Sequence, residues 1–281
     1  MKIDLERADL SPLRGKTFVV TGGANGIGRA IVILLGEAGG NVVYGDLQLA
    51  SNDPQNVKGC ICNVTKWNDL LLLFETAVKF FGPIHGIVTN AGVMESSNFF
   101  SDDVDSSGRL VEPNHLVINL NLIATLNCVK IAMHFGCKDI VLIASSRAYV
   151  PVPGMGSVTY TASKYGVIGI LRGLRSNPDV CVNCVSPHAT DTNMIDDGCL
   201  RKTMHESKQI IQTPQTIAKA VGYHFIQQWT GKCILVMGNG YYELEEAFAN
   251  SIDDWFDKEA RASLGVYKGA NINRLEGGLA N

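Results

Sequence analysis

Tyr160 and Lys164 stand four positions apart and together could transfer a proton. On an α-helix the side chains at i and i+4 share a face, so the phenol and the ammonium would lie side by side. A phenol has an unperturbed pKa of about 10, and the adjacent Lys cation together with a positive nicotinamide ring would favour the phenolate and lower that pKa. A phenolate can take the hydroxyl proton of an alcohol while hydride leaves for a nicotinamide cofactor. A Tyr–Lys pair can also simply cover a helix face, so the pair needs support from its surroundings.

Two serines upstream provide part of that support. Ser145 and Ser146 follow the apolar run 139–144, which is typical of a buried strand. A loop rich in Pro and Gly over 151–156 then leads to a helix expected over 158–175. One of the two hydroxyls could hold a substrate oxygen while Tyr160 exchanges its proton.

A glycine-rich stretch from Thr21 to Gly28 could bind a phosphate group. It lies between the apolar runs 18–20 and 30–35, an order that indicates strand, turn and helix. Glycine permits positive φ and has no Cβ, so the turn can be tight and a ligand can approach the backbone. The first N–H groups of the helix have no partner within it, and the helix dipole is positive there, so a pyrophosphate fits. A tight turn that binds nothing is the alternative.

Asp46 ends the next apolar run, 41–46, twenty positions after Gly26. An acid at this distance is placed to bond the adenosine ribose hydroxyls of NAD. NADP would bring a phosphate to the same place, and the carboxylate would repel it. Neither Asn25 nor Leu47 supplies a compensating cation. The position therefore predicts NAD, and a surface aspartate at a strand end is the alternative.

The elements that would position these residues alternate along the chain. Seven strands are expected, over 18–20, 41–46, 58–64, 84–90, 139–144, 180–185 and 233–237. They are continuous apolar runs, as in a parallel sheet that is covered on both faces. Helical segments between them predict an α/β class protein: a single-domain doubly wound fold with a seven-stranded parallel sheet flanked by helices. Ligands of such folds bind beyond the carboxyl ends of the strands.

Residues 1–242 are expected to form the catalytic domain, and 243–281 a helical extension of it. An apolar stripe at helical spacing runs through 243–264: Leu244, Phe248, Ile252 and Trp255. We expect this helix to pack on its own domain or on a neighbouring subunit, and a lid over a substrate pocket is the alternative.

The composition restricts the class of protein. Of 281 residues 46% are hydrophobic and 18% charged, with a net charge of −3, which argues against a disordered chain and against nucleic-acid or anionic-membrane partners. The beginning of the chain has no apolar segment of a secretory signal, so a cytoplasmic protein is expected. Eight cysteines include Cys181 and Cys184 at CxxC spacing, but within a strand-like run, so buried thiols are expected and no metal site.

At this point the sequence resembles the short-chain dehydrogenase/reductase family, from about Lys16 to Gly240. The motifs that carry the resemblance occur in one order: Thr21-Gly22-x-x-x-Gly26-x-Gly28, Asn90-Ala91-Gly92, Asn119, Ser146 and Tyr160-x-x-x-Lys164. The resemblance implies a Rossmann fold and an NAD-linked dehydrogenase. The sequence is also similar to fungal members of the family in secondary-metabolite pathways and to members that act on prostaglandin-like alcohols.

The resemblance also implies roles for individual residues. Tyr160 would be the general acid and base, Lys164 would bind the nicotinamide ribose, Ser146 would orient the substrate oxygen, and Asn119 would hold a water of the proton relay. Thr192 would reach the carboxamide of nicotinamide, and Asn90 and Gly92 would line the adenosine. The full expected cofactor set is Gly22, Asn25, Gly26, Ile27, Gly28, Asp46, Asn63, Val64, Asn90, Ala91, Gly92, Tyr160, Lys164, Pro187, Thr190 and Thr192.

Two positions depart from the family pattern. Asn63-Val64 replaces the frequent Asp-Val after the third strand, and its amide oxygen could still accept from the adenine amino group. Pro187-His188 replaces Pro-Gly after the sixth strand. His188 would either shape the loop, the interpretation we favour, or contact the substrate.

The expected function is NAD-dependent interconversion of a secondary alcohol and a ketone on a sizeable apolar small molecule, such as a terpenoid, steroid, lipid or polyketide-like compound. An isomerase or cyclase without net redox change and a non-catalytic NAD-binding protein are the alternatives. A homodimer or homotetramer is expected from the family habit of pairing through the helices over 114–135 and 158–175. The residues expected to shape the substrate pocket are Val93, Met94, Phe99, Phe100, Val150, Val152, Met155, Met194 and Ile195.

Overall fold

A computed structural model describes residues 2–5, 7–95, 99–150, 157–195, 210–257 and 259–260. Its centre is one sheet with the strand order β1-β9-β8-β7-β6-β5-β2-β3-β4. Seven neighbouring strands are parallel: β2 (Thr17–Thr21), β3 (Asn41–Asp46), β4 (Val57–Ile61), β5 (Gly86–Thr89), β6 (Asp139–Ile143), β7 (Cys181–Pro187) and β8 (Cys233–Met237). The predicted doubly wound fold and its seven parallel strands are confirmed.

The strand order reverses at β2, which has β3 on one side and β5 on the other. The chain therefore leaves the carboxyl ends of these strands in opposite directions, and a crevice opens between them. This is the place where doubly wound sheets bind their ligands.

Two edge strands were not predicted. β9 (Gly240–Glu243) pairs antiparallel with β8, and β1 (Lys2–Ile3) pairs antiparallel with β9. Gly238 and Asn239 join β8 to β9, and both have positive φ, at 58° and 63°. Two-residue hairpin turns require this conformation, and Gly and Asn adopt it readily, so the dipeptide was the signal in the sequence.

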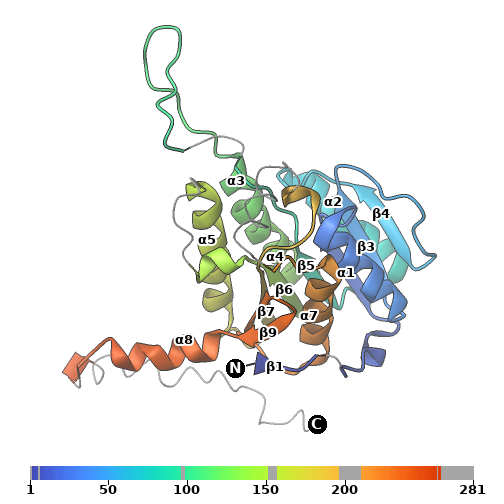
Figure 1. Cartoon of the computed structure of the whole chain (residues 1–281). Helices are drawn as coiled ribbons and strands as arrows, with labels where there is room; N and C mark the ends of the chain where they lie inside the picture. Colours follow the sequence, from blue (N-terminus) through green and yellow to red (C-terminus); the bar gives the residue numbers. More distant parts are fainter. Residues whose placement is uncertain are drawn as a thin grey trace.

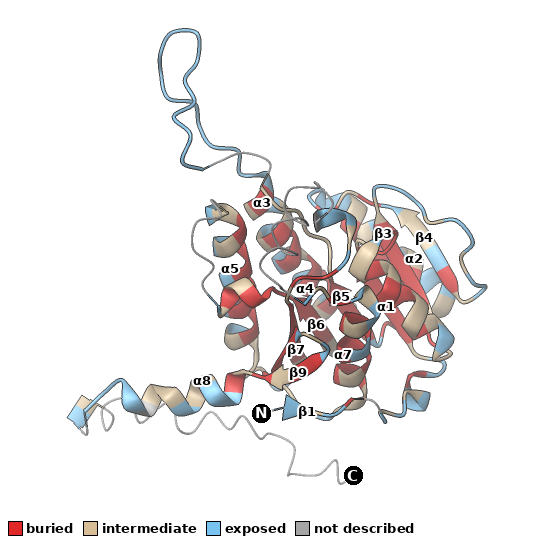
Figure 2. Cartoon of the chain, viewed as in Figure 1, coloured by how far each residue is buried: buried red, intermediate tan, exposed pale blue. Residues whose placement is uncertain are grey.

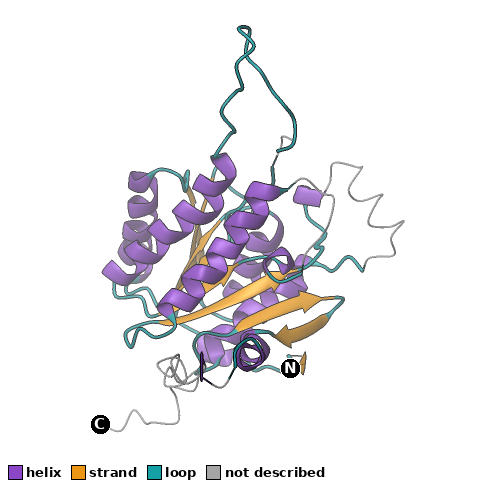
Figure 3. Cartoon of the chain, turned by 90° about the vertical axis from the view of Figure 1, so that its left-hand side faces the viewer, coloured by secondary structure: helices purple, strands orange, loops and turns teal. Residues whose placement is uncertain are grey.

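Helices cover both faces of the sheet, as Figures 1 and 3 show. α1 (Gly26–Glu37) and α7 (Pro214–Ile226) pack on one face, and α2 (Trp67–Phe81), α4 (Ala124–His134) and α5 (Val158–Leu174) on the other. Successive strand residues point to opposite faces, so Phe18 and Val20 enter the core under α1 and α7 while Val19 enters the other. The central strands are mostly apolar because both of their faces are buried, which Figure 2 shows in red, whereas the edge strand β4 exposes Lys58 and Ile61.

A helix runs from Leu116 to His134, close to the range predicted from the sequence. It begins as α3 (Leu116–Ile118), passes through a π-helical turn, η2 (Asn119–Ile123), and continues as α4. In this turn the N–H of Ala124 donates to the carbonyl of Asn119. By length and composition this helix could cross a membrane, but it packs against α2, α5 and the sheet as a core helix does.

The C-terminal extension is anchored by a buried carboxylate. α8 (Glu245–Ser251) and the turn η5 (Ile252–Asp254) extend away from the sheet in Figure 1, so the predicted helix over 243–264 is shorter than expected. Glu245 is fully buried and accepts hydrogen bonds from Arg172 (2.9 Å) on α5 and from Tyr149 (2.6 Å). These bonds fix the start of α8 against the body. The expected packing on its own domain is thus seen at this end, and residues 261–281 lie outside the described residues.

A second projection leaves the body between β5 and α3. Residues 99–114 form a long narrow loop, closed by a bridge between Val104 and Leu110 (Figures 1 and 3). Phe99 and Phe100 are exposed at its base.

Candidate active site

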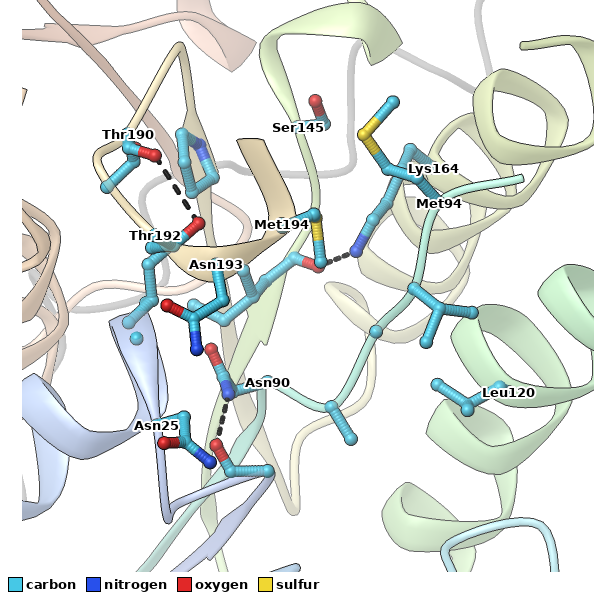
Figure 4. A pocket seen from close by; sticks show the side chains of 18 of the residues that line it. Asn25, Asn90, Met94, Leu120, Ser145, Lys164, Thr190, Thr192, Asn193 and Met194 are labelled. Carbon is cyan, nitrogen blue, oxygen red and sulfur yellow. Dashed lines mark hydrogen bonds between the residues drawn. The ribbon is translucent and has the colours of Figure 1, made fainter. Parts of the chain in front are cut away.

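A cavity of about 450 Å³ lies at the carboxyl ends of the parallel strands. Figure 4 shows Asn25 and Asn90 in one part of it and Lys164 and Met94 in another. All but one of the predicted cofactor-binding residues line this cavity. The exception is Gly28, which lies beneath the glycine-rich turn.

The glycine-rich turn leaves the start of α1 open to the cavity. A Cβ on Gly28 would overlap the carbonyl oxygen of Gly22, and Gly22 itself has φ of 68°. Asn25 is the N-cap of α1, but its side chain accepts no capping hydrogen bond. Gly26 and Ile27 line the cavity, so their backbone amides can receive an anion. The turn therefore fits the pyrophosphate of a dinucleotide.

Asn90 holds the turn in place. Its side-chain amide donates to the carbonyls of Thr21 (3.0 Å) and Gly22 (2.9 Å). On the opposite wall Thr192 lies so close to Gly26 that a Cβ there would come within 3.2 Å of its Cγ2. The segment after β7 and the turn after β2 thus close the cavity between them.

The adenosine end of the cavity contains Asp46 and Asn63. Asp46 accepts a hydrogen bond from the backbone N–H of Ala24 (2.9 Å), which fixes the carboxylate beside the turn. The amide oxygen of Asn63 accepts from the N–H and the hydroxyl of Thr65 (3.1 and 2.7 Å). Asn63 lines the cavity as predicted, but the oxygen that was expected to accept from adenine is directed to Thr65.

No cation stands beside Asp46 among the described residues that line the cavity. Lys164 and Arg147 are the lining cations, and both come from elements that follow β6. Arg29, at the start of α1, forms an ion pair with Asp53 at 2.6 Å and does not line the cavity.

Tyr160 and Lys164 both project from α5 into the cavity. The Lys164 ammonium donates to the carbonyl of Ile143 (2.9 Å), a contact drawn as a dashed line in Figure 4, and lies 5.7 Å from the centre of the Tyr160 ring. Burial lowers the pKa of Lys164 to about 8. The spacing correctly predicted that the two side chains share a face of the helix.

Lys164 alone does not lower the pKa of Tyr160 in the structure, which contains no nicotinamide. Burial raises the pKa of the phenol, and a hydrogen bond with Ser145 and the charge of Arg147 oppose this rise. Lys164 contributes little because its ammonium is directed to a backbone carbonyl and burial disfavours its charge. Without a ligand the phenol therefore stays protonated near neutral pH.

The serine beside the phenol is Ser145, not the predicted Ser146. Ser145 shares a hydrogen bond with Tyr160 and caps a short 3-10 helix, η3 (Ser146–Ala148), by accepting from the N–H of Arg147. The hydroxyl of Ser146 lies 3.0 Å from Nδ1 of His188. The sequence left the two serines undecided, because their directions depend on how the chain turns after β6.

The asparagine beside the site is the buried Asn121, which does not itself line the cavity, and not the predicted Asn119. Asn119 is exposed, whereas Asn121 is 1% exposed and bonds Val93 through both of its amide atoms at 2.9 Å. Its oxygen and the Lys164 ammonium both lie within 3.6 Å of the position that a Cβ on Gly92 would take. Helical periodicity was the available signal, because Asn121 shares the buried stripe of the helix with Thr125 and Cys128.

The pocket-shaping residues predicted from the sequence divide into three groups. Val93, Met94 and Met194 line the cavity. Phe99, Phe100 and Val150 do not, and all three are exposed. Val152, Met155 and the side chain of Ile195 lie outside the described residues. Leu120, which was not predicted, adds to the apolar wall.

The described cysteines, seven in number, are free thiols. Burial raises the pKa of Cys62 to about 12 and of Cys181 to about 11, so neither is a thiolate at neutral pH. Of the predicted buried CxxC pair, Cys184 is buried and Cys181 is partly exposed. Within the described part of the chain no three His, Cys, Asp or Glu side chains come together as metal ligands.

Comparison with known proteins gives the same family as these motifs. Residues 16–199 match the family model described as short chain dehydrogenase. The short-chain dehydrogenase/reductase ATR7 of Stachybotrys chlorohalonatus is 30% identical, covering 99% of this chain and 96% of its own. (+)-Borneol dehydrogenase 1 of Salvia officinalis is 30% identical over 75% of this chain and 86% of its own.

A solved structure shows the same architecture. Ligand-free aldohexose dehydrogenase of Thermoplasma acidophilum superposes with a TM-score of 0.69 at 25% identity, covering 82% of this chain and 95% of that chain. Its likeness extends over the doubly wound core described above. On the match of the family model, the motifs and the fold, the chain belongs to the short-chain dehydrogenase family of oxidoreductases.

Proposed function

We propose that this protein is an NAD-dependent dehydrogenase that interconverts a secondary alcohol and a ketone on a sizeable apolar molecule. The observation that carries the proposal is one cavity that joins an uncapped helix N-terminus to the group Ser145, Tyr160 and Lys164. A dinucleotide on that helix end would bring its nicotinamide toward the tyrosine. The bound nicotinamide would supply or accept the hydride.

The chain's own residues handle the proton and the position of the substrate. Tyr160 exchanges the proton at its phenolic oxygen, and Ser145 shares a hydrogen bond with that oxygen and orients the reacting oxygen of the substrate. Lys164 is expected to bind the nicotinamide ribose, and Asn121 takes the place that the sequence assigned to Asn119. Because burial raises the pKa of Tyr160, the phenol needs the positive charge of the oxidised nicotinamide to lose its proton.

The preference for NAD follows from Asp46. Its carboxylate is fixed beside the glycine-rich turn by the N–H of Ala24, and the lining cations lie elsewhere in the described cavity. A 2′-phosphate would meet this negative charge without a partner. Ribose hydroxyls would donate to it instead.

Apolar side chains around the reacting group support a sizeable apolar substrate. Val93, Met94, Leu120 and Met194 form this part of the wall. (+)-Borneol dehydrogenase 1 is named for a terpenoid alcohol, and 5′-hydroxyaverantin dehydrogenase of Dothistroma septosporum is a second relative named for an alcohol. A terpenoid, steroid, lipid or polyketide-like alcohol of secondary metabolism fits these walls.

An exposed apolar strip on α4 and α5 supports a homodimer or homotetramer. Ile123 and Leu126, in and after the π-helical turn, are 43% and 44% exposed, and Tyr165 on α5 is 52% exposed. Burying such side chains against a second copy is favourable.

The test is turnover by the Tyr160→Phe variant with a panel of terpenoid and steroid secondary alcohols. We expect the wild-type protein to produce one NADH for each ketone formed and the variant to lose turnover at least about a hundredfold. NAD affinity, measured by calorimetry, should survive in the variant. Product formation without NADH would indicate an isomerase or cyclase, and wild-type turnover in Tyr160→Phe would exclude the assigned acid–base group.

A further inference from the structure

Ser146 and His188 form a polar pair in the wall of the cavity. They follow β6 and β7, which are neighbouring parallel strands, so the two side chains meet at the same edge of the sheet. Oγ of Ser146 lies 3.0 Å from Nδ1 of His188, and both residues line the cavity. Neither the proton transfer by Tyr160 nor the expected cofactor contacts use this pair.

The imidazole is held rigidly. The N–H of His188 donates to the carbonyl of Val236 (2.9 Å), and its carbonyl accepts from the hydroxyl of Thr190 (2.8 Å) and the amide of Gln212 (3.4 Å). With the backbone fixed on one side and Nδ1 bonded on the other, the ring has one orientation. A rigid polar group of this kind is suited to selecting a ligand.

One ring nitrogen is left for a ligand. Nδ1 contacts Ser146, and Nε2 has no hydrogen-bond partner among the described residues. Burial and the charge of Arg147 lower the pKa of His188, so the ring is neutral near neutral pH and offers one donor and one acceptor. It can donate to a carbonyl or accept from a hydroxyl, depending on the direction of the Ser146 bond.

The surroundings of Nε2 of His188 make it unfavourable for this nitrogen to lack a hydrogen-bond partner when a substrate is bound. The apolar residues that line the same cavity include Met94, Leu120 and Met194, and a bound apolar molecule would exclude water from the pair. A buried donor or acceptor without a partner destabilises the complex, so a purely hydrocarbon surface does not suit this wall. An oxygen on the substrate would satisfy it.

The position of that oxygen follows from the chain. Ser145 contacts Tyr160, and Ser146, the next residue, contacts His188. The two serines are consecutive and line the same cavity as Tyr160 and His188, so one substrate molecule can reach both polar sites. Resting on the dehydrogenase function proposed above, we propose that the Ser146–His188 pair binds a second oxygen of the substrate, on a carbon next to the reacting carbinol or one further.

The substrate class is therefore a 1,2- or 1,3-dioxygenated molecule, a diol or a hydroxyketone, rather than a simple monoalcohol. His188 acts as a specificity residue that fixes which carbinol faces Tyr160. A glycine at this position, as the family pattern has, would offer no such contact.

Calorimetric binding to the NADH complex tests the inference without turnover. The probes are 1-indanone and 2-hydroxy-1-indanone, which differ by one hydroxyl beside the ketone. We expect wild-type protein to bind the hydroxyketone on the order of tenfold more tightly, as for one added hydrogen bond. In His188→Ala the ratio of the two affinities should fall to about one.

Ser146→Ala is the second variant, because it removes one oxygen without altering the backbone and should also reduce the ratio. His134→Ala, at an exposed histidine on α4, is the control and should keep the wild-type ratio. The inference is overturned if the wild-type protein binds the hydroxyketone no more tightly than the ketone, whatever the two affinities are. An unchanged ratio in both variants also overturns it.

The two proposals fail separately. Hydride transfer is no part of the calorimetric measurement, so a preserved affinity ratio in a protein that never oxidises alcohols would refute the dehydrogenase and leave the second-oxygen site. If the protein oxidises monoalcohols and diols equally well and binds the two probes with equal affinity, the second-oxygen site is refuted and the dehydrogenase function stands.

Discussion

Asn121 bonds Ser163 across the gap between two helices, with 3.1 Å between its amide nitrogen and the serine oxygen. The Ser163 hydroxyl in turn donates to the carbonyl of Tyr160 (2.7 Å). The π-helical turn is therefore tied to the turn of α5 that carries the candidate acid–base group. π-helical turns inside α-helices frequently occur at functional sites, and here the turn accompanies an amide directed inward.

Asn121→Ala should impair both stability and activity, whereas Asn119→Ala should affect neither. The first change removes the partners of both backbone groups of Val93 and of Ser163, and leaving buried polar groups unpaired costs about 1–3 kcal/mol. Asn119 is exposed and bonds none of them. Urea unfolding and turnover of the two variants make the comparison, and equal effects would contradict the placement of Asn121.

Ser145→Ala should reduce kcat/KM on the order of a hundredfold, as the loss of an aligned donor does in other enzymes. Because the Ser145 hydrogen bond lowers the Tyr160 pKa against the effect of burial, its loss should shift the alkaline-favoured oxidation profile to higher pH. Ser146→Ala should leave the pH profile in place, since its hydroxyl contacts His188. The pH dependence of kcat/KM for both variants provides the measurement. A shift in Ser146→Ala alone would restore the original assignment.

Asp46→Arg should change the cofactor preference toward NADP. Removing a carboxylate that would repel a 2′-phosphate and adding a cation should move the ratio of kcat/KM for NAD and NADP by on the order of tenfold or more. Asp53→Asn is the matched control, because Asp53 is paired with Arg29 and does not line the cavity. The measurement is kcat/KM for NAD and for NADP at a fixed alcohol concentration. Wild-type preference for NADP would refute the argument from Asp46.

Stability should fall as the pH decreases from about 6.5 to 4 because of His224. Trp229 donates to Nδ1 (3.0 Å) and Nε2 lies 2.9 Å from the carbonyl of Cys184, so the ring is held neutral. Burial lowers its pKa to about 4. Between that value and the unfolded pKa of about 6.5 only the unfolded chain binds the proton, which costs up to about 1.4 kcal/mol per pH unit.

The matched variant for this effect is His224→Gln, which cannot take up the proton. Its free energy of unfolding should be lower than that of the wild type at pH 7, and the difference should shrink as the pH falls toward 5. Urea unfolding across this range measures it. A difference that stays constant with pH would show that His224 does not titrate between the two states.

The sequence predicted the parts of this molecule that depend on local pattern. Seven apolar runs became the seven parallel strands, and the Tyr160–Lys164 spacing placed both side chains in one cavity. β1 and β9 were missed because neither is a continuous apolar run: β1 has two residues, and β9 includes Gly240 and Glu243. Their only signal was the turn at Gly238 and Asn239.

The site predictions that were wrong each chose between two residues of the same type that are close in the sequence. Ser145 and Ser146 differ in the direction that one residue takes after β6, and Asn119 and Asn121 differ in helix face across a π-helical turn. Both differences are set by tertiary packing rather than by residue type. The same holds for Lys164, whose ammonium is directed to the carbonyl of Ile143 by the strand that α5 covers.

The pairing of β1 with β9 has a consequence for the order of folding. Lys2 lies opposite Tyr242, so this contact closes a loop that contains nearly the whole catalytic domain. The entropy lost on closing a loop grows with its length, and contacts of large sequence separation slow folding when they must form early. We expect the core around β2 and β5 to assemble first and β1 to join last, so that removing it changes the rate of unfolding and leaves the rate of folding nearly unchanged.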